Sequence, residues 1–267
     1  MAPPSNDAIM QGMKQLSEFI SDLHEKDVAL KQGGDKSLAK LRAPLAKVVG
    51  DNDDIIKERI SHLKKAPKLT KPVPIPPPKS PLAVFDQFFQ PPFQYQWTDT
   101  GGDSGVGSAA ANDQDGTISI GVGAANQNGY AAAGVGFLFQ PPRDMVIYIE
   151  PLITYNFNWL DLANFINASC SAFFAIRVQV FDGSSKSLVD TIDFTYPLWN
   201  DTAGWLDEHS NSGTGATINA SPTIFVIGGY YYIIWFWFDI SCANGFSTFS
   251  DGSIEARVNY VFLYSPN

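Results

Sequence analysis

At 267 residues and 45% hydrophobic content, the chain can form one large domain or two ordinary ones around a packed core. Of its 18 Lys+Arg and 27 Asp+Glu, residues 1–82 hold 14 and 10, a net charge of +4, and residues 83–267 hold 4 and 17, a net charge of −13. The interleaved charges of the first part argue against nucleic-acid binding, and the acidic second part would be repelled by anionic lipid. We therefore expect two unlike parts, with neither nucleic acid nor a membrane as partner.

The N-terminal residues lack the long apolar segment of a secretory signal peptide, because polar residues interrupt residues 5–14. No apolar span is long enough to cross a bilayer as a helix. We expect synthesis in the cytoplasm, and any release from the cell would have to occur without a leader.

Residues 1–65 have the pattern of helices. The first helix is predicted to begin with Ser5 or Asn6 as its N-cap and to end at Gly33-Gly34. Apolar stripes in residues 38–48 and 56–63 predict two more helices. We interpret residues 1–65 as a small three-helix bundle, with a self-associating coiled coil as the alternative, and expect them to oligomerise or to dock on a partner. The first helix carries its apolar residues at steps of four and three, as in a coiled-coil seam: Ile9, Met13, Leu16, Ile20 and Leu23.

Residues 66–82, APKLTKPVPIPPPKSPL, form the clearest boundary in the chain. Proline at this density excludes helix and strand pairing and favours an extended polyproline II conformation. We predict a Pro-rich linker that holds the helical part away from a second domain at residues 83–267.

From residue 83 onward the hydrophobic pattern has a period of two, with turn residues at regular spacing. Within residues 172–181 the polar side chains of Arg177 and Gln179 are expected to point away from the core. Seven or eight such strands predict a mainly β fold, an antiparallel jelly-roll-like β-sandwich. The last strand, within residues 253–264, is expected to turn one set of side chains inward: Ile254, Ala256, Val258, Tyr260 and Phe262.

Residues 223–240, TIFVIGGYYYIIWFWFDI, are apolar on both faces of the strand that their composition predicts. We expect one long central strand, bent at Gly228-Gly229. The second apolar face needs a partner, which is another part of this chain, another subunit or a ligand. An exposed aromatic stripe of Tyr231, Trp235 and Trp237 is therefore a candidate ligand-binding surface, unless loops cover it.

The segment PLWNDTAGWLDEH, residues 197–209, combines indole rings with amide and carboxylate groups. Sugar recognition uses this mixture, because an apolar ring face stacks on an aromatic side chain while planar polar groups bind hydroxyls. The alternative is that the two tryptophans only anchor a loop to the core. The predicted ligand-binding residues in this segment are Trp199, Asn200, Asp201, Trp205 and Asp207.

Catalytic groups are sparse in residues 83–267. His209 is the only histidine there, which excludes a His-rich metal centre, and no cofactor is expected. The best acid–base cluster is Asp207-Glu208-His209, and a pair of such carboxyl groups could in principle serve a glycosidase. Residues 112–116, NDQDG, resemble the start of a calcium loop but lack its later glutamate. A plain turn is expected and no metal site is predicted, with a loosely held calcium ion as the alternative.

Cys170 precedes one predicted strand and Cys242 follows another. If the two strands are antiparallel neighbours, these two ends meet, and the geometry allows a disulfide.

We interpret the chain as a non-enzymatic binding and assembly protein, with helices for oligomerisation or docking and a sandwich that recognises a neutral glycan or a protein. One alternative is a pore-forming toxin component, because residues 101–136 are rich in small residues that alternate around a turn. A second alternative is a glycan-active hydrolase.

Overall fold

The computed structural model describes residues 3–32, 67–69, 83–103, 106–163, 167–204, 207–245 and 248–266. The second and third predicted helices and most of the predicted Pro-rich linker lie outside the described residues. The division into a helical part, a linker and a sandwich therefore stays a prediction. Within the described part of the chain, no helix is both long and apolar enough to cross a membrane.

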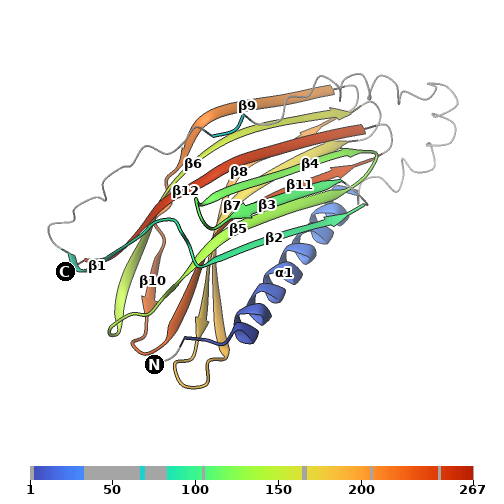
Figure 1. The fold of residues 1–267 in the computed structure, drawn as a ribbon. Coiled ribbons are helices and arrows are strands. Elements are labelled where there is room, and N and C mark those ends of the chain that lie inside the picture. The colour runs from blue at the N-terminus through green and yellow to red at the C-terminus, as the bar shows by residue number, and fades with distance from the viewer. Residues whose placement is uncertain are drawn as a thin grey trace, which may run out of the picture.

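Two antiparallel sheets form the body of the protein (Figure 1). The predicted antiparallel β-sandwich is confirmed, and its jelly-roll connectivity stays a prediction. The seven-stranded sheet contains β1 (Ala83–Phe89), β3 (Gly107–Asn112), β4 (Thr117–Ala125), β6 (Met145–Ala163), β9 (Asp207–Ile218), β10 (Thr223–Val226) and β12 (Thr248–Pro266). The five-stranded sheet has the order β2 (Tyr95–Gly102), β5 (Gly129–Phe139), β11 (Tyr231–Asn244), β7 (Ala168–Phe181) and β8 (Leu188–Ala203).

The main core lies between the sheets and follows from the period-two pattern. In β4, Ile118, Ile120 and Val122 are buried, while the residues between them are half-buried on the outer face. They meet the inward side chains of β11, including Phe236 and Phe238, in one continuous cluster. Alternation of this kind is what closes two sheets over a shared apolar layer.

The aromatic run forms two strands, and the prediction of one bent strand is wrong. Residues 223–226 form β10 in the seven-stranded sheet, and residues 231–244 form β11 at the centre of the five-stranded sheet. Gly229 has φ of 87°, a conformation that glycine adopts without strain, and the chain reverses there through a bond from Tyr230 N–H to Ile227 C=O. The glycine pair thus carries the chain from one sheet to the other.

Helix α1 (Asn6–Gln32) lies across the outer face of the five-stranded sheet (Figure 1). As predicted, Ser5 caps it, its Oγ accepting the Ala8 N–H at 3.3 Å. Ile9, Leu16 and Ile20 from the predicted seam are buried in a second apolar cluster with residues of the sheet. Burial of such side chains stabilises the docked helix by about 1.5–3 kcal/mol each. The partner of the second apolar face of β11 is therefore a helix of the same chain.

Candidate ligand-binding sites

The predicted aromatic stripe lies beneath α1. Trp235 is 0% exposed, and Trp237 and Tyr231 are also buried, in the cluster that contains Ile9 and Leu16 of the helix. The expectation that this stripe is open to a ligand is corrected, because helix side chains occupy the surface on which a ligand would stack.

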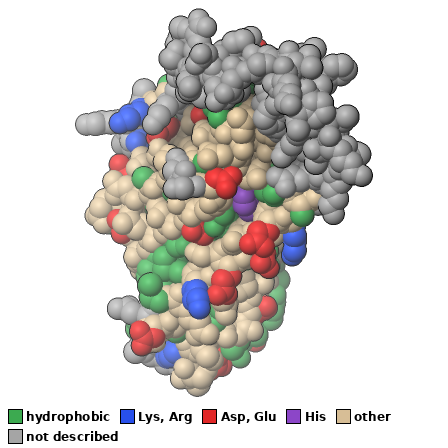
Figure 2. All heavy atoms as spheres, turned by 90° about the vertical axis from the view of Figure 1, so that its right-hand side faces the viewer, with side chains coloured by type: hydrophobic (Ala, Val, Ile, Leu, Met, Phe, Trp, Pro, Cys, Tyr) green, Lys and Arg blue, Asp and Glu red, His purple; other side chains and the backbone are tan. Residues whose placement is uncertain are grey.

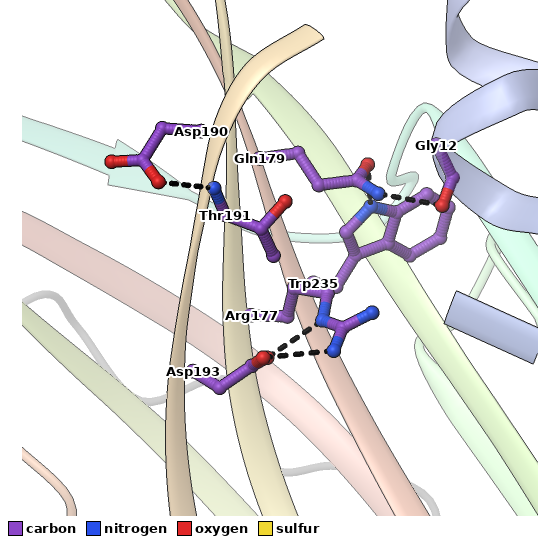
Figure 3. A network of polar contacts seen from close by, with 7 residues as sticks. All are labelled: Gly12, Arg177, Gln179, Asp190, Thr191, Asp193 and Trp235. Atoms are coloured by element: carbon purple, nitrogen blue, oxygen red, sulfur yellow. Dashed lines mark hydrogen bonds and ion pairs between the residues drawn. The ribbon is translucent and has the colours of Figure 1, made fainter. Parts of the chain in front are cut away.

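Polar contacts fix the helix to this face (Figure 3). Trp235 Nε1 donates to Gln179 Oε1 at 2.9 Å, and Gln179 Nε2 donates in turn to the Gly12 carbonyl at 2.8 Å. Nearby on β7, the Arg177 guanidinium donates two bonds of 2.6 and 2.8 Å to the Asp193 carboxylate of β8. Arg177 and Gln179 point away from the sandwich core, as the alternation predicts, but they too are buried.

The predicted loop site is partly assembled at the edge where β8 and β9 lie near each other. Trp199, half-buried, stacks on Phe157 of β6 with ring centroids 5.6 Å apart. Asn200 is exposed on β8. Trp205 lies outside the described residues. Because Trp199 and Asn200 are consecutive residues of β8, their side chains point to opposite faces: Trp199 packs against the core, and Asn200 is exposed.

His209 connects the two predicted carboxylates of this edge. Its Nδ1 lies 2.8 Å from Asp201 Oδ2, and its Nε2 lies 2.9 Å from Asp207 Oδ2. The bond to Asp201 raises the pKa of His209. Both carboxylates are thus already paired with the imidazole, which competes with any sugar hydroxyl for the same oxygens.

Asp161 lies behind this cluster, opposite His209 in the β6–β9 pair. It is fully buried, and its Oδ2 accepts the Cys170 N–H at 2.9 Å. Burial raises the pKa of Asp161 to about 7, and the neighbouring Asp201 carboxylate contributes in the same direction. Asp161 is therefore closed to solvent, whereas Asp201 and Asp207 are partly exposed.

A further surface, missed by the sequence interpretation, begins at an irregularity in β12. Ile254, Ala256 and Val258 face the core as expected, but the pairing with β6 shifts between Val258 and Tyr260. The extra residue reverses the alternation, so that Val261 and Leu263 take the core positions. The expectation that Tyr260 and Phe262 point inward is therefore wrong: they lie on the outer face.

These outward rings form an aromatic row with their neighbours on the seven-stranded sheet. Tyr264 stacks on Tyr148 of β6 at 5.1 Å with an interplanar angle of 12°, and Phe262 lies against Tyr264 at 5.3 Å. Phe88 of β1 packs against Tyr260 at 5.2 Å. The row therefore extends over three neighbouring strands of the outer face.

A cavity of about 300 Å³, named here the Tyr260 cavity, opens beside this row. It lies at a gap along the edge of β6. Strand β9 pairs with β6 from Ile153 onward, and β10 pairs with β6 only as far as Tyr148, so neither strand pairs with the residues between them. Pro151 sits in that stretch, and because proline has no N–H it tolerates an unpaired edge. The lining residues are Glu150, Pro151, Leu152, Ile218, Asn219, Ala220, Ser221 and Tyr260.

Among the described residues, the lining of the Tyr260 cavity holds one acidic side chain and no basic one. Glu150 Oε1 accepts hydrogen bonds from the Tyr264 hydroxyl at 2.7 Å and from Ser221 Oγ at 3.3 Å. Burial, and then the Glu150 carboxylate, raise the pKa of Tyr264 to about 12, so this hydroxyl remains a donor at neutral pH. Figure 2 shows the same acidic surplus elsewhere: on the face it draws, red side chains are spread widely and blue ones are fewer.

Exposed apolar side chains continue the outer surface beyond the aromatic row. Phe225 of β10, which is 61% exposed, is paired with the exposed Val146 of β6, and Ile227 follows on the same edge. Among the described residues, no group of three or more His, Cys, Asp or Glu is placed to hold a metal ion.

No family model matches the chain, and no curated protein matches it either. Among solved structures, it is similar to a carbohydrate-binding module in complex with β-1,4-galactotriose, at 10% identity over 63% of this chain and 88% of that chain, with a TM-score of 0.19. It is also similar to the enzymatically active domain of bacteriophage CBA120 tailspike protein 4, at 13% identity over 66% of this chain and 19% of that one, with a TM-score of 0.21. A third similarity is to the family 11 xylanase from Neocallimastix patriciarum, at 12% identity over 59% and 96%, with a TM-score of 0.18. At TM-scores this low, none of these similarities identifies a family or a ligand.

Proposed function

We propose that the protein is a non-enzymatic recognition protein whose β-sandwich binds a neutral glycan at the Tyr260 cavity. The observation that supports this most is the lining of the cavity, where one aromatic ring stands beside a carboxylate, an amide and a hydroxyl. Tyr260 offers a face on which the C–H side of a sugar ring can stack, and Glu150, Asn219 and Ser221 can bind its hydroxyl groups.

The charge of the site favours a neutral ligand. No lysine or arginine lines the cavity among the residues that the structure describes, so a sulfated, phosphorylated or carboxylated glycan would meet Glu150 with no compensating charge from them. Each hydrogen bond contributes about 1 kcal/mol net, so a single site with three or four contacts should bind in roughly the millimolar range. If the protein self-associates, several such sites would act together and raise the avidity. Self-association through α1 would have to use residues other than the buried Ile9, Leu16 and Ile20.

The second candidate is the edge where β8 and β9 lie near each other, because His209 lies within hydrogen-bond distance of both Asp201 and Asp207, two of the residues predicted there. We rank it below the Tyr260 cavity, since the indole of Trp199 packs against the core and stacks on Phe157.

The toxin and hydrolase alternatives have less support. The strands on either side of the turn at residues 126–129 are β4 and β5, which belong to different sheets and bury side chains in the core between them. They are not a separate hairpin available to a membrane. A hydrolase needs two carboxyl groups facing one cavity, and in the described part of the chain Glu150 is the only carboxyl group that lines the Tyr260 cavity.

The test is an array of neutral oligosaccharides probed with the full chain, followed by calorimetric titration of the strongest binder. Tyr260→Ala should weaken binding about tenfold or more, because it removes the stacking face, and Glu150→Gln should weaken it less. Trp199→Ala serves as the matched control and should leave binding unchanged.

Thermal unfolding of each variant shows whether a loss of binding merely reflects a loss of fold. Binding that survives Tyr260→Ala but is lost in a folded Trp199→Ala variant would move the site to the β8–β9 edge. An array with no signal for any neutral oligosaccharide would reject the proposed function.

A further inference from the structure

Two buried thiols face each other near one end of the five-stranded sheet, on two neighbouring strands. Cys170 of β7 and Cys242 of β11 are direct partners in the antiparallel register, and their Sγ atoms lie 3.4 Å apart. Both side chains are fully buried in the core between the sheets. The sequence predicts that these two strand ends meet, and the structure confirms it.

The surroundings of the pair are shaped for two sulfur atoms. A Cβ added to Gly252 of β12 would lie 2.8 Å from Cys170 Sγ, so the absence of a side chain there leaves the space that the sulfur occupies. The Cys170 N–H is held by the Asp161 carboxylate at 2.9 Å, and the β7–β11 pairing runs through both cysteines without an irregularity. The two sulfur atoms are therefore held close together by structure that does not depend on a bond between them.

We propose that Cys170 and Cys242 form an intramolecular disulfide when the chain folds in the presence of a low-molecular-weight disulfide oxidant. Antiparallel neighbours in direct register have Cα atoms within the separation that a disulfide bridges, and closing the remaining sulfur–sulfur gap requires only small side-chain movements. This inference is independent of the proposed glycan site, which shares no residue with it.

The exchange proceeds in two balanced steps. The thiolate of one cysteine attacks the oxidant disulfide, forms a mixed disulfide and releases one small thiol; the second cysteine then attacks the mixed disulfide and releases the other. The cysteines together lose two electrons and two protons, and the oxidant is reduced to two thiols. Burial raises the pKa of the Cys242 thiol, so in the folded protein the thiolate is scarce as well as shielded. The bond should consequently form during folding and only slowly afterwards.

A bond between these cysteines would close a loop that contains β8, β9 and β10. Closing a loop of that length in the unfolded chain raises the thermal midpoint, by the chain-entropy relation, on the order of 10 °C for a protein of this size. The bond would also prevent β7 and β11 from separating at this end of the sheet.

The experiment compares the full chain refolded with oxidised glutathione and refolded with dithiothreitol. Each sample is denatured, treated with iodoacetamide and weighed by intact mass spectrometry. The glutathione sample should take up no alkyl group and the dithiothreitol sample two. The glutathione sample should also have a higher thermal midpoint than the dithiothreitol sample. A Cys242→Ser variant should have the same thermal midpoint under the two conditions.

The mass measurement needs no substitution, so it remains decisive if the variant does not fold. Two alkyl groups in both samples, a stable mixed disulfide with glutathione, or chains joined only to one another would each overturn the proposal.

Discussion

Replacing Leu16 by alanine should weaken the docking of α1 on the five-stranded sheet. Leu16 is 0% exposed and lies in the cluster that contains Trp97, Trp235 and Trp237. A buried Leu→Ala change in a packed core destabilises by about 2.7–5.0 kcal/mol, and because this interface is a helix edge that can partly collapse, we expect about 3 kcal/mol. Unfolding by guanidinium chloride, followed by tryptophan fluorescence, measures the change because several indoles lie beneath the helix.

Met10→Ala is the matched control for this prediction. Met10 is on the same helix but is 62% exposed, so its replacement should change stability by no more than about 0.5 kcal/mol. If Leu16→Ala and Met10→Ala unfold at the same denaturant concentration, α1 does not pack on the sheet as described. If Leu16→Ala speeds amide hydrogen exchange only in the helix and β11, the substitution releases the helix without unfolding the sandwich.

Two further changes test buried polar groups. Gln179→Ala removes the amide that joins Trp235 to the Gly12 carbonyl and leaves both without that partner, so urea unfolding should show a loss of roughly 1–3 kcal/mol; an unchanged midpoint would contradict the bridging role. Asp161→Asn tests the pKa of about 7 for this carboxyl group. The folded protein retains a proton on Asp161 that the unfolded chain loses above about pH 4. The stability of the wild type relative to the variant should therefore fall between pH 4 and 7, by up to about 1.4 kcal/mol per pH unit. Parallel stability curves for the two proteins would show that Asp161 ionises normally in the folded state.

The β-sandwich could be predicted because the pattern that indicates each strand lies within a few consecutive residues. Alternation such as Ile118, Ile120 and Val122 reports which face of a strand is buried, and the positions of Cys170 and Cys242 report which strand ends meet. The partner of the second apolar face could not be predicted in the same way. An apolar helix stripe and an apolar strand face each require cover, but neither pattern specifies that they cover each other.

The candidate site was missed for a related reason. A single additional residue between Val258 and Tyr260 inverts the alternation, and no residue type in that stretch marks the shift. The cavity beside Tyr260 depends in addition on where β9 and β10 stop pairing with β6, which is a property of three strands together. By contrast, Trp199, Asn200 and Asp201 are adjacent in the sequence, so their proximity required no tertiary information.

The position of β11 has a consequence for biosynthesis. β5 and β7 both pair with it, so the five-stranded sheet cannot close until this strand, near the end of the chain, has been made. Helix α1 is made before β11 and docks on it, although the strand follows roughly 200 residues later. At about 5–20 residues per second, its apolar stripe is exposed for roughly 10–40 s on the ribosome. During that interval a chaperone could bind the nascent helix through the same side chains that later contact the sheet.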